Sequence, residues 1–196
     1  MQLIPSPRIF VLPHFLSTDE CDHLMKLSRP YLQPSLVVDD SKAHGEQLDT
    51  RRSSTGMSLY SSDPLVKTIE QRIADLTSLP IENGETIQIL HYGLGAEYVP
   101  HYDYFNPATP GGASFLERGG QRVATIILYL NTPEAGGETI FPHLGITVTP
   151  EKGRALLFYN CRPDGTVDPL TLHGGAPVKA GEKWIATRWI RTEKFQ

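Results

Sequence analysis

His101-Tyr102-Asp103 places an imidazole and a carboxylate two residues apart on a segment with strand character. Because side chains alternate between the two faces of a strand, both groups are expected to point to the same side. A third ligand is expected from His173, far along the chain, at the end of another apolar run. Two imidazoles and one carboxylate on one face of an octahedron suit Fe(II) and leave three coordination positions open. These residues therefore predict an iron site.

Lys183 lies ten residues after His173, across a Gly- and Pro-rich turn, on the strand-like run 183–191. A fixed cation close to an open iron site suits an anionic cosubstrate. A lone His-X-Asp is more often a surface pair or a helix cap, whereas four required residues in order are far more specific. This order is typical of iron- and 2-oxoglutarate-dependent dioxygenases.

Other residues of ligand type are not expected to bind the metal. His44 lies in a polar loop and His143 lies in a turn after a proline. His91 has the opposite strand parity to the tyrosine that follows it. Glu138 is not required once Asp103 supplies the carboxylate.

Length and composition indicate one domain spanning residues 1–196, large enough to bury a substantial core. A net charge of −4 argues against a bulk electrostatic grip on nucleic acid. The first residues lack signal-peptide character and no apolar run is long enough to span a membrane, so a cytoplasmic location is expected. Cys21 and Cys161 are expected to be reduced, and the oligomeric state is left open.

Helical signals gather in the first part of the chain, at about residues 17–77. Ser17–Glu20 reads as a capping box, from which an amphipathic helix runs to about Arg29. Ser62 or Asp63 caps a second helix that ends at about Thr77. Both helices are expected to support one sheet.

The remainder predicts a mainly β fold with supporting helices, a double-stranded β-helix or jelly roll, whose core spans about residues 86–191. The metal is expected between its sheets. Polar residues 39–50 and Gly/Pro-rich residues 107–120 are expected to be loops, and 82–85 a turn. Short strands are expected at 9–12, 51–60, 86–92, 122–130, 136–142, 146–148, 153–159, 170–173 and 183–191.

Several short motifs lie between the predicted strands and around the predicted ligands. They are Gly-Gly-Gln-Arg122, Tyr-Leu-Asn131, Gly-Gly-Glu-Thr139, Lys-Gly-Arg-Ala-Leu156 and Leu-His-Gly174. With these motifs the chain resembles the catalytic domain of the collagen-type prolyl 4-hydroxylases, especially the small single-domain forms of bacteria and algae, from about Arg8 to Arg191. The resemblance implies a jelly roll that requires Fe(II), 2-oxoglutarate and O2, with ascorbate as reductant.

The resemblance also implies roles for individual residues. The implied iron ligands are His101, Asp103 and His173; the implied cosubstrate residues are Lys183, Tyr92, Thr139 and Tyr129; the implied peptide-groove residues are Arg122, Tyr98 and Trp189. Trp189 shares strand parity with Lys183, which independently places both toward the interior. The alternative for Tyr92 and Thr139 is that they are ordinary strand residues. The alternative for Arg122 is that it only caps a surface at the start of its strand. The 39–50 loop resembles a lid over peptide substrate.

The expected reaction is hydroxylation of prolyl residues in a peptide or protein, with release of succinate and CO2. Asp103 favours hydroxylation, because a smaller residue there would leave room for chloride, as in related halogenases. A hydroxylase of a free amino acid or another small molecule is the alternative, and a non-enzymatic metal-binding jelly roll a third. Nucleic-acid demethylases of the wider group typically use arginine where this chain has Lys183, so Lys183 disfavours that class.

Overall fold

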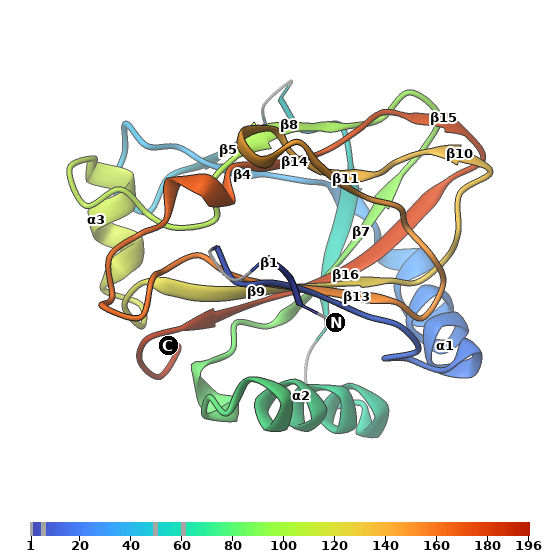
Figure 1. The fold of residues 1–196 in the computed structure, drawn as a ribbon, viewed down its shortest axis with the longest axis horizontal. Helices are drawn as coiled ribbons and strands as arrows, with labels where there is room; N and C mark the ends of the chain where they lie inside the picture. The colour runs from blue at the N-terminus through green and yellow to red at the C-terminus, as the bar shows by residue number, and fades with distance from the viewer. Residues whose placement is uncertain (1, 5–6, 49–50, 60–61) are drawn as a thin grey trace.

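Two β-sheets face each other across the interior of the chain (Figure 1). The computed structural model describes residues 2–4, 7–48, 51–59 and 62–196. The large sheet has the order β1-β2-β13-β9-β16-β7-β6-β3, formed by Gln2–Ile4, Ile9–Leu12, Ala155–Tyr159, Arg122–Tyr129, Lys183–Arg191, Ile87–Tyr92, Thr55–Leu59 and Gln33–Pro34. The small sheet has the order β12-β11-β14-β8, formed by Ile146–Val148, Thr139–Phe141, His173–Gly175 and Tyr98–His101. The predicted jelly roll is confirmed.

Short pairs of strands and single turns complete the chain. The two pairs are β4 with β5, at Val37–Val38 and Glu46–Gln47, and β10 with β15, at Ala135–Gly136 and Val178–Ala180. The short 3-10 turns η1 to η4 lie at Arg29–Tyr31, Ile81–Asn83, Pro142–Leu144 and Pro169–Thr171.

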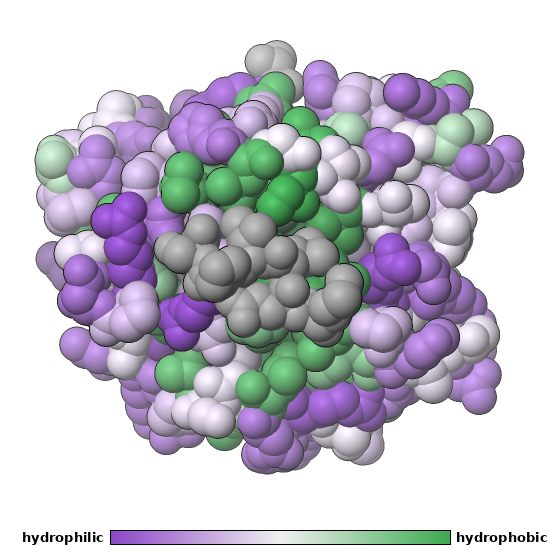
Figure 2. Space-filling view, in the orientation of Figure 1, coloured by the Kyte–Doolittle hydropathy of each residue, from purple (hydrophilic) through white to green (hydrophobic). Residues whose placement is uncertain are grey.

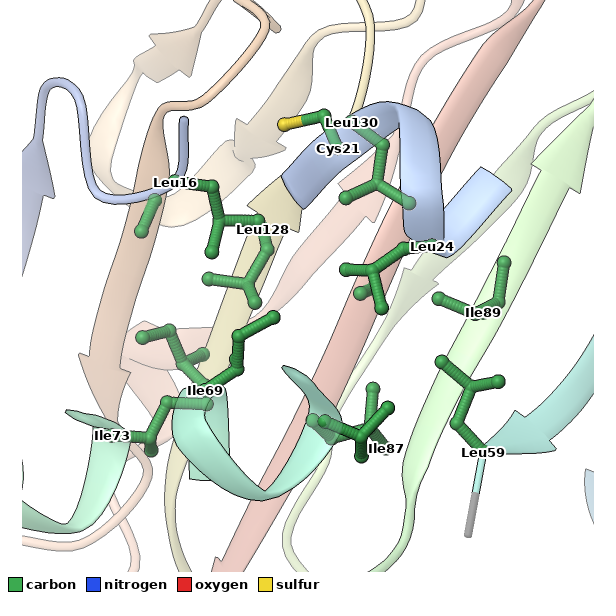
Figure 3. Packing of buried hydrophobic residues seen from close by; sticks show 14 of the residues in the cluster. Leu16, Cys21, Leu24, Leu59, Ile69, Ile73, Ile87, Ile89, Leu128 and Leu130 are labelled. Atoms are coloured by element: carbon green, nitrogen blue, oxygen red, sulfur yellow. The ribbon is translucent and has the colours of Figure 1, made fainter. Parts of the chain in front are cut away.

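Helices α1, Thr18–Ser28, and α2, Pro64–Thr77, cover the outer face of the large sheet (Figure 1). Ser17 and Glu20 form the expected capping box, with each side chain bonded to the other residue's backbone N–H. Asp63 caps α2 by accepting bonds from two backbone N–H groups. The residues that join the helices to the sheet include Leu24, Ile69, Ile73, Ile87, Ile89 and Leu128 (Figure 3).

A second apolar cluster lies between the inner faces of the two sheets. Its members include Leu90, Ile127, Ile185, Phe141, Val148 and Phe158. Strand β16 serves both clusters, because alternate side chains point to opposite faces. Trp184 and Ala186 belong to the helix-facing cluster, whereas Ile185 belongs to the inner one.

Residues 107–120 are not only a loop, as the sequence suggested, because they contain helix α3, Pro110–Leu116. Thr109 caps it by accepting a bond from the Gly112 N–H at 3.0 Å. The Gly-rich composition hid the Thr-Pro start signal, which is the kind of signal that predicted α2.

The polar 39–50 loop also contains structure. Strands β4 and β5 pair as a short hairpin in which Asp39 N–H donates to the Gly45 carbonyl. Residues 49–50 lie outside the described part. Residue 60, the expected end of the strand at 51–60, also lies outside it, and β6 begins at Thr55.

The prediction of a strand at 170–173 is wrong. Asp168 instead caps η4, so His173 begins β14 rather than ending a strand. The strand expected at 136–142 is split into β10 and β11, and the turn expected at 82–85 begins earlier, as η2.

Cys21 and Cys161 are both buried free thiols, and Cys21 lies on the buried face of α1. Within the described residues, no helix has the length and apolar character needed to cross a membrane. Hydrophilic residues dominate the edges of the face seen in Figure 2, whereas hydrophobic residues gather near its centre.

We expect Leu24→Ala to lower the free energy of unfolding by about 2–5 kcal/mol, because Leu24 is fully buried between α1 and the large sheet. Urea denaturation measures the change. Lys26→Ala, on the exposed side of the same helix, is the matched control. Equal losses in both variants would contradict the assigned packing.

Candidate active site

The three predicted metal ligands meet between the two sheets. Strands β14 and β8 pair so that His173 lies opposite His101, with ring centres 4.5 Å apart. Asp103 follows β8 and reaches both rings: its two carboxylate oxygens lie 3.6 Å from His101 Nε2 and 3.6 Å from His173 Nε2. All three ligand atoms lie within 4.8 Å of one another.

Backbone carbonyls select the ring nitrogen that each histidine offers. His101 Nδ1 lies 2.9 Å from the Val99 carbonyl and His173 Nδ1 lies 3.0 Å from the Thr171 carbonyl. A carbonyl only accepts, so each Nδ1 carries the proton and each Nε2 keeps a lone pair for a metal. Burial also lowers the pKa of His173 to about 4, which favours the neutral ring.

Asp103 is held by two residues that sequence reasoning missed. The Thr125 hydroxyl donates to Asp103 Oδ2 at 2.7 Å, and Asn160 Nδ2 donates to the Thr125 hydroxyl oxygen at 2.9 Å. Burial alone would raise the pKa of Asp103, but the charge of Arg122 and the hydrogen bond from the Thr125 hydroxyl favour the ionised carboxylate, and the pKa lies well below its ordinary value. The carboxylate is therefore ionised and oriented.

This donor set fits Fe(II). It offers two neutral imidazole nitrogens and one carboxylate, each fixed by a further hydrogen bond, in a group compact enough to bind one ion. Both the donor types and their grouping agree with the sequence prediction.

A pocket between the sheets extends from the ligands to Lys183. The residues that line it include Arg52, Leu90, Tyr92, Tyr98, His101, Asp103, Ile127, Thr139, His173, Lys183, Ile185, Thr187 and Trp189. Lys183, Ile185, Thr187 and Trp189 are alternate residues of β16, so the predicted inward parity of Lys183 and Trp189 is confirmed.

Lys183 is 2% exposed, and its ammonium has no hydrogen-bond acceptor among the described residues. Burial lowers the pKa of Lys183 to about 8, with partial opposition from the charge of Glu138. The buried Thr187 hydroxyl and Trp189 Nε1 likewise lack partners in the described part of the chain. A buried cation without an acceptor suits an anionic ligand such as 2-oxoglutarate.

Two predicted cosubstrate residues, Tyr92 and Thr139, line this pocket. Lys183 Nζ lies 5.2 Å from the centre of the Tyr92 ring. Tyr129, predicted with them, instead stands behind the wall, where its hydroxyl bonds the Thr139 hydroxyl at 2.7 Å. Tyr129 is thus placed to orient Thr139, and its contact with the cosubstrate stays a prediction.

Tyr98 and Trp189, predicted for the peptide groove, also line the pocket. The Tyr98 ring stacks on His101 with centres 3.6 Å apart, and burial raises the pKa of Tyr98 to about 12, so its hydroxyl keeps its proton. Arg122 lies outside the lining. It forms two bonds with Glu85, at 2.6 and 2.8 Å, and its guanidinium carbon lies 4.0 Å from the Trp189 ring centre. Arg122 is therefore neither a surface cap nor a free anchor, and it supports Trp189 from behind.

Arg52 is a further pocket residue that the sequence analysis did not single out. It is 8% exposed and lies opposite Tyr98 in an isolated β-bridge. Its position depends on pairing between segments far apart in the sequence. The only early signal was its place at the start of an expected strand.

The residues excluded as ligands lie away from the ion site. His91 bonds Glu182 on the other face of β7, and His143 contacts the Pro169 carbonyl. His44 lies in the β4–β5 hairpin. A wider groove of about 940 Å³ runs along α2 and Arg188, outside the large sheet. Its buried charges already pair with each other, and it contains none of the metal ligands.

Comparison with known proteins identifies the family. Residues 87–191, which carry all three ligands and Lys183, match the 2OG-Fe(II) oxygenase superfamily. The chain belongs to this superfamily. Membership assigns Fe(II), 2-oxoglutarate and O2 to the oxygenase, in agreement with its His-Asp-His group and buried lysine.

The relatives of this oxygenase include plant proteins from Arabidopsis thaliana. "Probable prolyl 4-hydroxylase 7" is 43% identical over 100% of the chain, which spans 66% of that protein's length. "Prolyl 4-hydroxylase 5" is 40% identical over 97% of the chain and 70% of its own length. A viral collagen prolyl hydroxylase from Paramecium Bursaria Chlorella virus-1, solved with 2OG, has a TM-score of 0.72 and 31% identity over 93% of this chain and 95% of its own.

We expect Thr125→Val to weaken metal binding by about 10- to 100-fold, because it removes the hydroxyl that orients Asp103 while keeping a similar shape. Calorimetric titration with Co(II), with circular dichroism as a folding check, measures the effect. Asp103→Ala should abolish specific binding. Native affinity in Thr125→Val would show that the hydroxyl is dispensable.

The lysine pKa predicts a pH dependence for 2-oxoglutarate. Below pH 8 Lys183 is protonated and binding should be strongest; as pH rises above about 8 the ammonium loses its charge and the Kd should increase. Lys183→Arg retains a charge and should flatten the profile, whereas Lys183→Ala should lose about 2–5 kcal/mol of binding at neutral pH. Titrations with Co(II) in place of iron test this. If wild type and Lys183→Arg showed the same change of Kd with pH, the pH dependence would belong to a group other than Lys183.

Proposed function

We propose that this oxygenase hydroxylates prolyl residues in a peptide or protein, consuming 2-oxoglutarate and O2 and releasing succinate and CO2. The observation that carries the proposal is the high identity, over nearly the whole chain, with proteins named prolyl 4-hydroxylases. The metal ligands and Lys183 supply what this reaction requires, and Tyr98 and Trp189 provide aromatic surface beside the ligands.

When bound, iron and 2-oxoglutarate supply the oxidising chemistry, and the protein places the reacting carbon. Lys183 holds the distal carboxylate of 2-oxoglutarate, with help from the Thr139 hydroxyl. His101, Asp103 and His173 would hold the ion with three ligands, and the coordination positions that they leave open would take cosubstrate and O2. The apolar side chains of Leu90, Ile127 and Ile185 limit water around this chemistry.

Aromatic rings explain how a proline ring would be positioned. Trp189 offers a flat apolar face, and the Trp189 Nε1 and the Tyr98 hydroxyl can bond peptide carbonyls. Arg122 keeps the Trp189 ring in place through its cation–π contact, while Glu85 neutralises the guanidinium. We assign Arg122 a positioning role and Trp189 a direct contact with substrate.

One observation favours a second candidate, the hydroxylation of a free amino acid. The Arg52 guanidinium donates to the Ser54 hydroxyl, the Leu36 carbonyl and the Gln88 amide oxygen. It forms no ion pair with a carboxylate in the described residues, although it is buried beside the pocket. A guanidinium has five N–H donors, so two remain for a small substrate's carboxylate.

Two further expectations from the sequence stay proposals. We propose ascorbate as the reductant that maintains Fe(II), on the family resemblance. A cytoplasmic location likewise stays a proposal.

We expect Trp189→Ala to reduce succinate release with a proline-rich peptide by at least about tenfold, because it removes a central aromatic contact. The slow decarboxylation of 2-oxoglutarate without substrate should change much less, since the iron site is intact. His173→Ala should lose both reactions. Tyr31→Ala, at an exposed remote ring, should alter neither.

Free proline, assayed beside the peptides, separates the two candidates. Mass spectrometry should find a hydroxylated prolyl residue in the peptide, and free proline should be turned over poorly. Faster turnover of free proline than of the peptides, together with loss of that turnover in Arg52→Gln, would favour hydroxylation of a free amino acid.

A further inference from the structure

The β4–β5 hairpin, residues 37–47, docks directly on helix α3. The Gly111 N–H donates to the Asp40 carbonyl at 3.2 Å, and the His44 N–H donates to the Ser114 hydroxyl oxygen at 2.7 Å. These segments lie about seventy residues apart in the sequence. Figure 1 shows them at the same end of the molecule.

Gly111 allows this approach. A Cβ atom added there would lie 2.4 Å from the Asp39 carbonyl oxygen and 2.8 Å from Asp40 Cα, both closer than real contacts permit. Glycine weakens a helix relative to alanine. Its presence inside the short helix α3 is therefore explained by packing against the hairpin rather than by helix formation.

The other end of α3 is fastened to the wall of the pocket. Arg191 donates to the Phe115 carbonyl at 3.0 Å and to the Gly120 carbonyl at 2.7 Å. Its Nε donates to Glu85, the carboxylate that also binds Arg122 beneath the Trp189 ring. One continuous set of contacts thus joins α3 to a pocket-lining aromatic residue.

The base of the hairpin is joined to the opposite wall. Arg52 donates to the Leu36 carbonyl at 3.1 Å, and its guanidinium carbon lies 4.9 Å from the Tyr98 ring centre. Tyr98 in turn stacks on the metal ligand His101. The hairpin is therefore connected to the site in two ways. Its base is connected through Arg52 and Tyr98, and its tip is connected through helix α3.

We propose that α3 is a positioning element for the substrate: Gly111 and Ser114 latch the hairpin onto α3 and so hold the substrate side of the pocket in its binding shape. The substrate part rests on the proposed function, whereas the latch does not. A hairpin ordered beforehand lowers the entropy lost on binding a flexible peptide. Releasing the latch should weaken substrate binding and leave cosubstrate binding unchanged.

Gly111→Ala tests the latch without any catalysis. Its methyl group displaces the hairpin but favours the helix itself. Lys42, whose side chain is 76% exposed, offers a trypsin site at the hairpin tip, and cleavage there requires local opening. Loss of both latch bonds should speed cleavage at Lys42 by about tenfold, as followed by mass spectrometry.

Two variants complete the set. Ser114→Ala removes the bond from the His44 N–H together with the hydroxyl's own bond to the Gly111 carbonyl within α3, and it should accelerate cleavage less and without any clash. Ala113→Ser, exposed on the same helix, is the matched control and should behave as wild type. Wild-type cleavage rates in both Gly111→Ala and Ser114→Ala would overturn the latch.

Steady-state kinetics test the substrate part. In Gly111→Ala the KM for a proline-rich peptide should rise by about tenfold, while the KM for 2-oxoglutarate and the uncoupled decarboxylation stay unchanged. If Gly111→Ala were cleaved faster but had an unchanged KM for the peptide, the positioning role would be wrong, whereas the contact between the hairpin and α3 would still be supported. A wild-type protein that decarboxylates 2-oxoglutarate but hydroxylates no peptide would refute the proposed function, and the trypsin comparison would still decide the latch.

Discussion

The antiparallel pairing of β14 with β8 determines the geometry of the whole site. It sets His173 opposite His101, and the turn after β8 then brings Asp103 against both rings. Neither strand is long, so the pairing depends on the jelly roll around it. The large sheet supplies the opposite wall, from which Lys183 faces the pocket and Thr125 bonds the ligand Asp103. A shift of one residue in this register would turn the two histidines to opposite sides.

The sequence predicted the parts of the site that follow from local periodicity. The spacing of His101 and Asp103, and the shared parity of Lys183 and Trp189, need only the alternation of a strand. Thr125 and Asn160 could not be found in this way, because their role arises from contacts between strands far apart in sequence. Tyr129 and Arg122 were assigned by resemblance, and their position behind the pocket wall depends on packing that no motif encodes.

Errors in the predicted elements have similar physical causes. Residues 107–120 were expected to form a loop because glycine and proline dominate the composition, although Thr109 and Pro110 form a regular helix start. The run ending at His173 alternates like a strand, but the Asp168 side chain bonds the backbone and favours a 3-10 turn. In both segments one capping residue outweighed the pattern of the whole run.

Strand β16 separates two tasks along a single nine-residue segment. Trp184, Ala186 and Ile190 pack against the helices, whereas Lys183, Thr187 and Trp189 border the pocket. Thr187 and Trp189 line the pocket and lie outside the helix-facing cluster, so substitutions there change the pocket lining and leave that cluster intact. Selection acting on substrate range therefore has two positions at its disposal outside the helix-facing core, which makes this strand a favourable starting point for laboratory evolution of new specificity.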